Sequence, residues 1–127
     1  MSNASNKRLT IFLGVSFAGL LVLFSCLFWS YGWLKVQVAF ASEQTEVFDE
    51  MRIQAIQSDA TNAVSCLQYV VNYYPTGSKQ ETGSRLDRIV ERERTLAERD
   101  IIAHLRIKTG EDLGTNSEAW IQKYAKQ

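Results

Sequence analysis

The longest uncharged stretch, residues 9–34, constrains the fold more than any other feature of this chain. It reads LTIFLGVSFAGLLVLFSCLFWSYGWL, 26 residues without a charge in a protein of 127. A helix of that length reaches about 39 Å, more than the ~30 Å hydrocarbon core of a bilayer. Residues 9–28 would already span this core, and Trp29, Tyr31 and Trp33 then lie at the depth where amphipathic rings favour the headgroup layer. The stretch therefore predicts a membrane-spanning helix or the leader of an exported protein.

Three interpretations of this stretch compete, and we favour an uncleaved signal-anchor helix. A cleaved signal peptide would end after Ala41, because residues 39–41 read Ala-Phe-Ala, the small-x-small form of a cleavage site. Against cleavage, the apolar region of a signal peptide usually holds about 7 to 15 residues. The third interpretation is a lipoprotein signal, since residues 23–26 read Leu-Phe-Ser-Cys and resemble a lipobox that ends at Cys26.

Basic residues near the stretch set the expected orientation. Lys7 and Arg8 precede it, and Lys35 is the only cation close behind it. Because basic residues favour the cytoplasmic side, we expect a cytoplasmic tail over residues 1–8, a transmembrane helix over 9–34 and an extracytoplasmic domain over 35–127. The predicted location is a bacterial inner (plasma) membrane, crossed once.

The charge of the distal part argues against one class of partner. All 14 acidic residues lie beyond residue 42, together with 11 of the 14 basic ones, which leaves a net charge of −3. A domain with this balance and no basic cluster is not expected to bind nucleic acid.

Apolar residues beyond the membrane stretch recur every three or four positions, which is the period of a helix. The pattern predicts an all-α domain, a small helical hairpin closed by a short C-terminal helix. The expected helices cover residues 43–73, 84–108 and 116–125, and Asp59 interrupts the apolar face of the first. Pro75, Gly77 and Gly83 mark the turn that follows it.

Capping residues and side-chain pattern give the later helices their expected ends and faces. A capping box of Ser84 and Asp87 opens the second helix, and either Thr115 with Glu118 or Asn116 caps the last. Trp120 is the expected anchor of the last helix, which is too short to stand alone. The expected buried stripe of the second helix is Leu86, Ile89, Val90, Leu96, Ala97, Ile101, Ile102 and Leu105. Its expected solvated face is Arg88, Glu91, Arg92, Arg94, Glu98 and Arg99.

Leu105-Arg106, residues 109–114 (Thr-Gly-Glu-Asp-Leu-Gly) and Trp120 form one motif near the C-terminus. The motif resembles the closing "LR…TGxDxG…W" segment of bacterial HEAT-like helical repeat domains. The chain departs from that pattern in having Asn116-Ser117 where Asp-Pro is common, in lacking a second Trp and in having no internal repeat. The resemblance implies a helical scaffold or interaction module and brings no catalytic residue with it.

The inventory of reactive side chains gives no candidate catalytic, cofactor-binding or metal-ligating residue. One His and two Cys are too few for a clustered metal site. Cys26 would lie in the bilayer and Cys66 outside it, so the two cannot form a disulfide within the chain. A nucleophile pair of Cys66 and His104 is conceivable across two facing helices, but a buried structural thiol explains Cys66 better. We therefore expect neither an enzyme nor a cofactor.

The sequence as a whole predicts a membrane-anchored helical protein with a structural, protein-interaction or accessory-subunit role. Its expected partners are the lipid bilayer and either another protein or a second copy of itself. Gly14 and Ala18 stand one helical turn apart, a spacing that permits close helix packing in lipid. The alternative is a secreted or periplasmic helical binding module, released by cleavage after Ala41.

Overall fold

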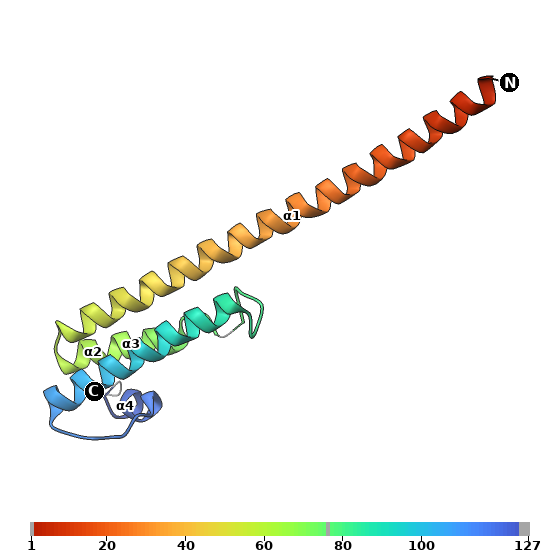
Figure 1. Cartoon of the computed structure of the whole chain (residues 1–127). Helices are drawn as coiled ribbons and strands as arrows, with labels where there is room; N and C mark the ends of the chain where they lie inside the picture. The colour runs from red at the N-terminus through yellow and green to blue at the C-terminus, as the bar shows by residue number, and fades with distance from the viewer. Residues whose placement is uncertain (1, 76, 125–127) are drawn as a thin grey trace. The chain divides into compact units, whose positions relative to one another are not determined.

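The computed structural model describes residues 2–75 and 77–124, and within these residues the chain is helical without any strand. Four helices follow one another (Figure 1): α1 (Ser2–Ile56), α2 (Ala60–Asn72), α3 (Arg85–Thr109) and α4 (Ser117–Tyr124). The predicted all-α class is confirmed. The chain divides into two compact units, Met1–Val36 and Gln37–Gln127, and helix α1 contributes to both.

The first unit is a single stretch of α1 with exposed apolar side chains. Every large apolar side chain between residues 9 and 34 is more than half exposed, from 51% at Leu21 to 80% at Trp29. Of the helices in the described residues, only α1 is long and apolar enough to cross a membrane.

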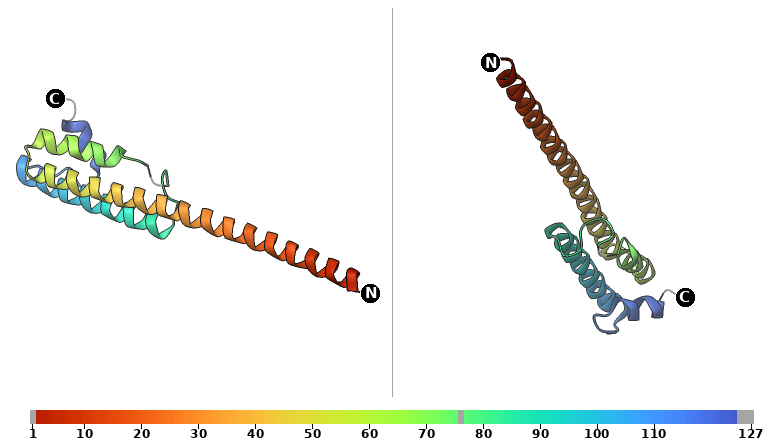
Figure 2. Two further views of the ribbon diagram at one scale, coloured as in Figure 1. Left: turned by 90° about the horizontal axis from the view of Figure 1, so that it is seen from above. Right: turned by 90° about the vertical axis from the view of Figure 1, so that its right-hand side faces the viewer.

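The second unit contains three long helical segments in an up-down-up order, closed by α4. Gln44, Phe48 and Arg52 of α1 contact Gln80, Arg94 and Asp100 respectively, so α1 and α3 run in parallel. Helix α2 runs antiparallel to both, because its end near Val70 contacts Arg94 while the turn at Ser58 contacts His104. Two further views show the three segments lying side by side (Figure 2).

One predicted element is wrong: residues 43–73 do not form one helix. Helix α1 ends at Ile56 and α2 begins at Ala60, so the domain holds three long segments and a short helix instead of a two-helix hairpin. Asp59 caps α2, since its carboxylate accepts a hydrogen bond from the backbone N–H of Asn62 at 2.9 Å. The Ser58 hydroxyl bonds the carbonyl of Ala55, which helps to close the turn. The spacing of apolar residues every three or four positions continues across this turn. The sequence pattern therefore does not reveal that the chain reverses its direction there.

The two later helices match their predicted positions. Helix α3 begins after Ser84, whose hydroxyl accepts from the N–H of Asp87 at 3.1 Å, and its C-cap is Gly110 with a φ of 71°. A positive φ is inexpensive for Gly, which is why it follows the last helical residue. Asn116 and not Thr115 caps α4, through its side-chain oxygen and the N–H of Glu118 at 3.0 Å. The last predicted residue of this helix, 125, lies outside the described residues.

The core draws on all four helices. Trp120 of α4, Phe48 of α1, Leu67 of α2, and Ile101 and Leu105 of α3 are fully buried. Trp120 is thus placed inside the domain as predicted, and its indole N–H donates to the carbonyl of Gly114 at 3.0 Å. Of the predicted α3 stripe, Ile89 proves to be 46% exposed.

Candidate interaction surface

The reactive side chains singled out in the sequence are not brought together. His104 shares a hydrogen bond of 3.2 Å between its Nε2 and the carbonyl oxygen of Ser58, which ties α3 to the turn before α2. Cys66 is buried in the core, and burial raises the pKa of its thiol. A thiol with a raised pKa is a poor nucleophile at neutral pH. Among the described residues, no three His, Cys, Asp or Glu side chains cluster in a way that could hold a metal ion.

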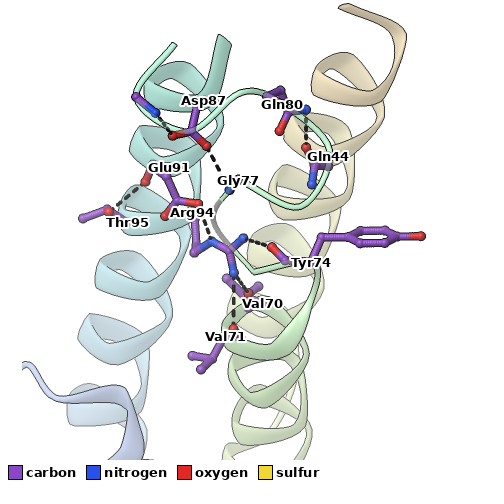
Figure 3. A network of polar contacts seen from close by, with 11 residues as sticks. Gln44, Val70, Val71, Tyr74, Gly77, Gln80, Asp87, Glu91, Arg94 and Thr95 are labelled. Atoms are coloured by element: carbon purple, nitrogen blue, oxygen red, sulfur yellow. Dashed lines mark hydrogen bonds and ion pairs between the residues drawn. The ribbon is translucent and has the colours of Figure 1, made fainter. Parts of the chain in front are cut away.

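Arg94 lies at the centre of a polar network, which contradicts its predicted place on the solvated face. The side chain is only 8% exposed. It donates from Nη1 to the carbonyls of Val70 and Val71 at 3.1 and 3.2 Å, and from Nη2 to the carbonyl of Tyr74 (Figure 3). The Val70 and Val71 carbonyls belong to the last turn of α2, which has no intrahelical donors for them, and Tyr74 follows the C-cap Tyr73. Arg94 therefore closes the C-terminal end of α2.

Two further contacts surround the charged guanidinium of Arg94. The guanidinium carbon lies 5.0 Å from the ring centroid of Phe48, a cation–π arrangement that joins α3 to α1. The buried Nε lies 3.4 Å from a carboxylate oxygen of Glu91, an ion pair without hydrogen-bond geometry. Glu91 and Arg94 thus form an ion pair along α3 in which the Arg94 side chain is buried and the Glu91 side chain is partly exposed.

Asp87 and Gln80 hold the loop between α2 and α3. The Asp87 carboxylate accepts from the N–H groups of Gly77 at 3.2 Å and Gly83 at 2.8 Å (Figure 3). The buried amide of Gln80 donates to the Gln44 amide oxygen of α1 at 2.7 Å. Gly77 has a φ of 75°, and a Cβ there would clash with the Thr82 hydroxyl. Loop and helices thus form one connected unit around Arg94.

A groove of about 600 Å³ lies beside this network, on the outward side of α2 and the start of the loop. Its lining carries three tyrosines, two amides, a hydroxyl and a proline: Tyr69, Tyr73, Tyr74, Gln68, Asn72, Ser65 and Pro75. No side chain in this lining is charged. The volume falls within the range of small-molecule and peptide sites, and tyrosine is among the residues enriched at protein interfaces.

The tyrosines of the groove form a continuous aromatic ridge. Tyr69 and Tyr73 stack with ring centroids 5.2 Å apart, and Tyr73 meets Tyr74 edge-on at 4.7 Å. Tyr73 also packs edge-on against Phe48, and burial together with the nearby Glu43 carboxylate raises the pKa of its phenol. Tyr69 and Tyr74 remain 47% and 40% exposed. Tyr73 therefore fixes the aromatic ridge to the core, and Tyr69 and Tyr74 remain accessible to solvent.

Tyr74 holds an unusual backbone conformation, with a φ of 42°. A bulky residue with positive φ is strained by about 1 to 3 kcal/mol and persists only where its surroundings hold it. Here Arg94 donates a hydrogen bond to the Tyr74 carbonyl, and the Lys79 ammonium lies 4.6 Å from the centre of the Tyr74 ring. Tyr74 thus belongs both to the buried Arg94 network and to the exposed row of tyrosines. No periodicity in the sequence predicts this link.

The C-terminal motif has a local structural explanation for most of its residues. Asp112 accepts from the N–H of Gly114 and from Nε of Arg106, both at 2.9 Å, and these donors lower the pKa of its carboxyl. Gly114 in turn offers its carbonyl to Trp120. The motif thereby turns the chain from α3 into α4 and seats the indole.

Comparison with known protein families, with curated proteins and with solved structures found no match to this chain. The resemblance to HEAT-like repeats therefore stays a prediction.

Proposed function

We propose that this chain is a single-pass membrane protein that holds a small helical interaction domain outside the cytoplasm. The observation that carries the proposal is the exposed apolar face of residues 9–34, which covers the whole circumference of α1 there. A helix that is apolar all round requires an apolar surrounding, and a bilayer is the one that its length fits. Lys7 and Arg8 orient the N-terminus toward the cytoplasm.

Retention of the helix is supported by the place of Ala41. This residue would end a cleaved signal peptide, yet it lies inside α1 and is only 5% exposed in the core of the helical domain. The ring centroid of Phe40, one residue earlier, lies 4.7 Å from the Lys79 ammonium nitrogen. Cleavage after Ala41 would remove both contacts from the domain. Release as a secreted module is the second candidate, and the small-x-small triplet is the feature that favours it.

The interaction role is supported by the groove on α2. Its uncharged, tyrosine-rich lining has the composition of an interface core, where charged residues are depleted and aromatic ones enriched. We assign a binding role on the strength of this lining. An accessory subunit of a membrane complex fits these features.

The mass of the protein in carbonate-washed membranes tests the anchor. We expect the full-length chain in the membrane pellet; a soluble fragment that starts at Ser42 would favour the secreted form. The double variant Leu20→Arg with Phe24→Arg should release the chain from the membrane. Each charge at the centre of the helix raises the free energy of membrane insertion by about 2.5 to 3.5 kcal/mol. Ile107→Arg is the matched control, because Ile107 is 82% exposed on α3 and should leave the chain in the pellet.

A further inference from the structure

The groove on α2 combines exposed aromatic rings with hydrogen-bond donors that the protein does not use itself. Tyr69 and Tyr74 are exposed, and Tyr73 fixes them to the core. In the described part of the chain, the hydroxyls of these three tyrosines and the side-chain amide of Gln68 form no hydrogen bond. A ligand in the groove therefore meets flat apolar rings with free O–H and N–H groups beside them.

The groove lacks the features that most other modes of peptide recognition need. Addition of a β-strand needs the edge of a sheet, and the described residues contain no strand. An amphipathic helix needs a groove of aliphatic side chains, whereas no Leu, Ile, Val or Met lines this one. Phosphorylated, acidic and chain-terminal groups need clustered arginines or free backbone N–H groups, and this lining is uncharged and mostly helical. Docking of a polyproline II helix on aromatic side chains is the recurring mode that remains.

We propose that the groove binds a proline-rich segment of a partner protein in the polyproline II conformation; the inference rests on the proposed interaction role and specifies its ligand. A polyproline II helix has no internal hydrogen bonds, so its carbonyls stay free, and proline has no N–H to donate. The tyrosine hydroxyls and the Gln68 amide can donate to these carbonyls. The apolar proline rings pack flat on the tyrosine rings, and the preformed conformation loses little entropy on binding.

The size of the aromatic ridge sets the length of the segment. Its ring centroids lie 5.2 and 4.7 Å apart, from Tyr69 to Tyr73 and from Tyr73 to Tyr74. These spacings limit the ridge to about one turn of a polyproline II helix, which is three residues and ~9 Å long. The ridge therefore accommodates two prolines one turn apart. A contact of this size predicts weak and reversible binding.

Fluorescence anisotropy of a labelled ten-proline peptide tests the proposal. The full-length chain in detergent micelles is titrated into the peptide, and a labelled Gly-Ser peptide of the same length is the control probe. We expect the polyproline peptide to bind at least about tenfold more tightly than the Gly-Ser peptide. The reason is that the flexible control offers no apolar ring and must lose more entropy to become extended.

Substitutions in the groove show whether the ridge is the binding site. Tyr69→Ala should weaken polyproline binding about tenfold, as expected for an aromatic anchor. Ile89→Ala is the matched control, since Ile89 is 46% exposed on α3 against 47% for Tyr69, and it should leave the affinity unchanged. Limited proteolysis checks that each variant is folded. Gln68→Ala, which removes an exposed donor and should cost about threefold, replaces Tyr69→Ala in the test if the latter is protease-sensitive.

Three results overturn the proposal. The first is polyproline binding no tighter than that of the Gly-Ser peptide. The second is a folded groove variant that binds polyproline as tightly as Ile89→Ala does. The third is calorimetric binding of chitotetraose, a neutral glycan, by a chain that does not bind polyproline, which would assign the groove to a sugar. Each of these leaves the membrane anchor intact, and failure of the anchor would show differently, as loss of the full-length chain from the membrane pellet.

Discussion

Arg94 lies buried on α3 and donates hydrogen bonds to the backbone carbonyls of Val70, Val71 and Tyr74. Its neighbours Arg88, Glu91, Arg92, Glu98 and Arg99 suggest a solvated run, and nothing in the run distinguishes the one arginine that turns inward. The distinction arises from the end of α2, which leaves carbonyls that need a donor. Those carbonyls are supplied by another helix, so the sequence of α3 alone does not reveal them.

Replacement of Arg94 should destabilise the domain more than any surface arginine. Arg94→Met keeps the stem but leaves the buried Val70 carbonyl without its donor, which costs about 1 to 3 kcal/mol. Arg94→Lys should recover only part of this lost stability, because the lysine ammonium does not reproduce the planar, forked arrangement of donors in a guanidinium. Pulse proteolysis of the full chain in detergent measures the difference. Arg92→Ala, an exposed control, should change stability by at most about 0.5 kcal/mol; an equal effect of Arg92→Ala and Arg94→Met would contradict the buried role.

At the scale of the helices, the sequence predicted the type of each element better than the path of the chain. The Ser84 cap, the Gly110 end and the docking of Trp120 follow from local chemistry and are confirmed. The turn at residues 57–59 was missed because the apolar period passes through it in phase. In a continuous helix, Phe48 and Tyr73 would lie about 38 Å apart. Their rings instead lie 6.0 Å apart, and only a long-range contact of this kind reveals the reversal.

Helix α4 depends on Trp120 for its order, because eight residues cannot form a stable helix alone. Truncation of a fully buried indole costs about 3 to 5 kcal/mol, a large share of the stability of so small a domain. Trp120→Ala should therefore unfold the helical domain or expose it to protease while residues 9–34 stay inserted. Limited proteolysis in membranes measures this. Parental resistance of Trp120→Ala would contradict the anchoring role.

The attachment of α4 should also weaken in acid. Glu111 accepts from the Lys123 ammonium and from the Tyr124 hydroxyl, and these bonds lower the pKa of its carboxyl from the ordinary value of 4.5. Since the folded pKa is lower than the unfolded one, the stabilisation is present above pH 4.5 and is lost as the pH falls through the folded pKa. With Trp29→Phe and Trp33→Phe, Trp120 emission should shift to the red over that range. Glu111→Gln should reduce the pH dependence, and Glu111→Gln with Asp112→Asn should remove it, because the Asp112 carboxyl also has a lowered pKa and holds the turn that seats Trp120. A shift of undiminished size in the double variant would assign it to another group.

At the scale of the molecule, two parts of different chemistry share one long helix. Residues 9–34 were predictable from composition alone, because no charge interrupts them and nothing in the described structure covers them. The uncharged groove on α2 was not predicted, since its residues are ordinary one by one. Only the packing of α3 and α4 against the other faces of α2 shows which side remains open.

The central claim is that residues 9–34 anchor the chain with its helical domain outside the cytoplasm. Its most direct test is a pair of reporters fused after Gln127 and expressed in a bacterium, one active only in an oxidising compartment and one only in the cytoplasm. We predict activity from the first reporter and none from the second, with Lys7→Glu and Arg8→Glu together reducing the first signal, because they remove the basic residues that orient the helix. Activity from the cytoplasmic reporter alone would contradict the orientation and the placement of the domain.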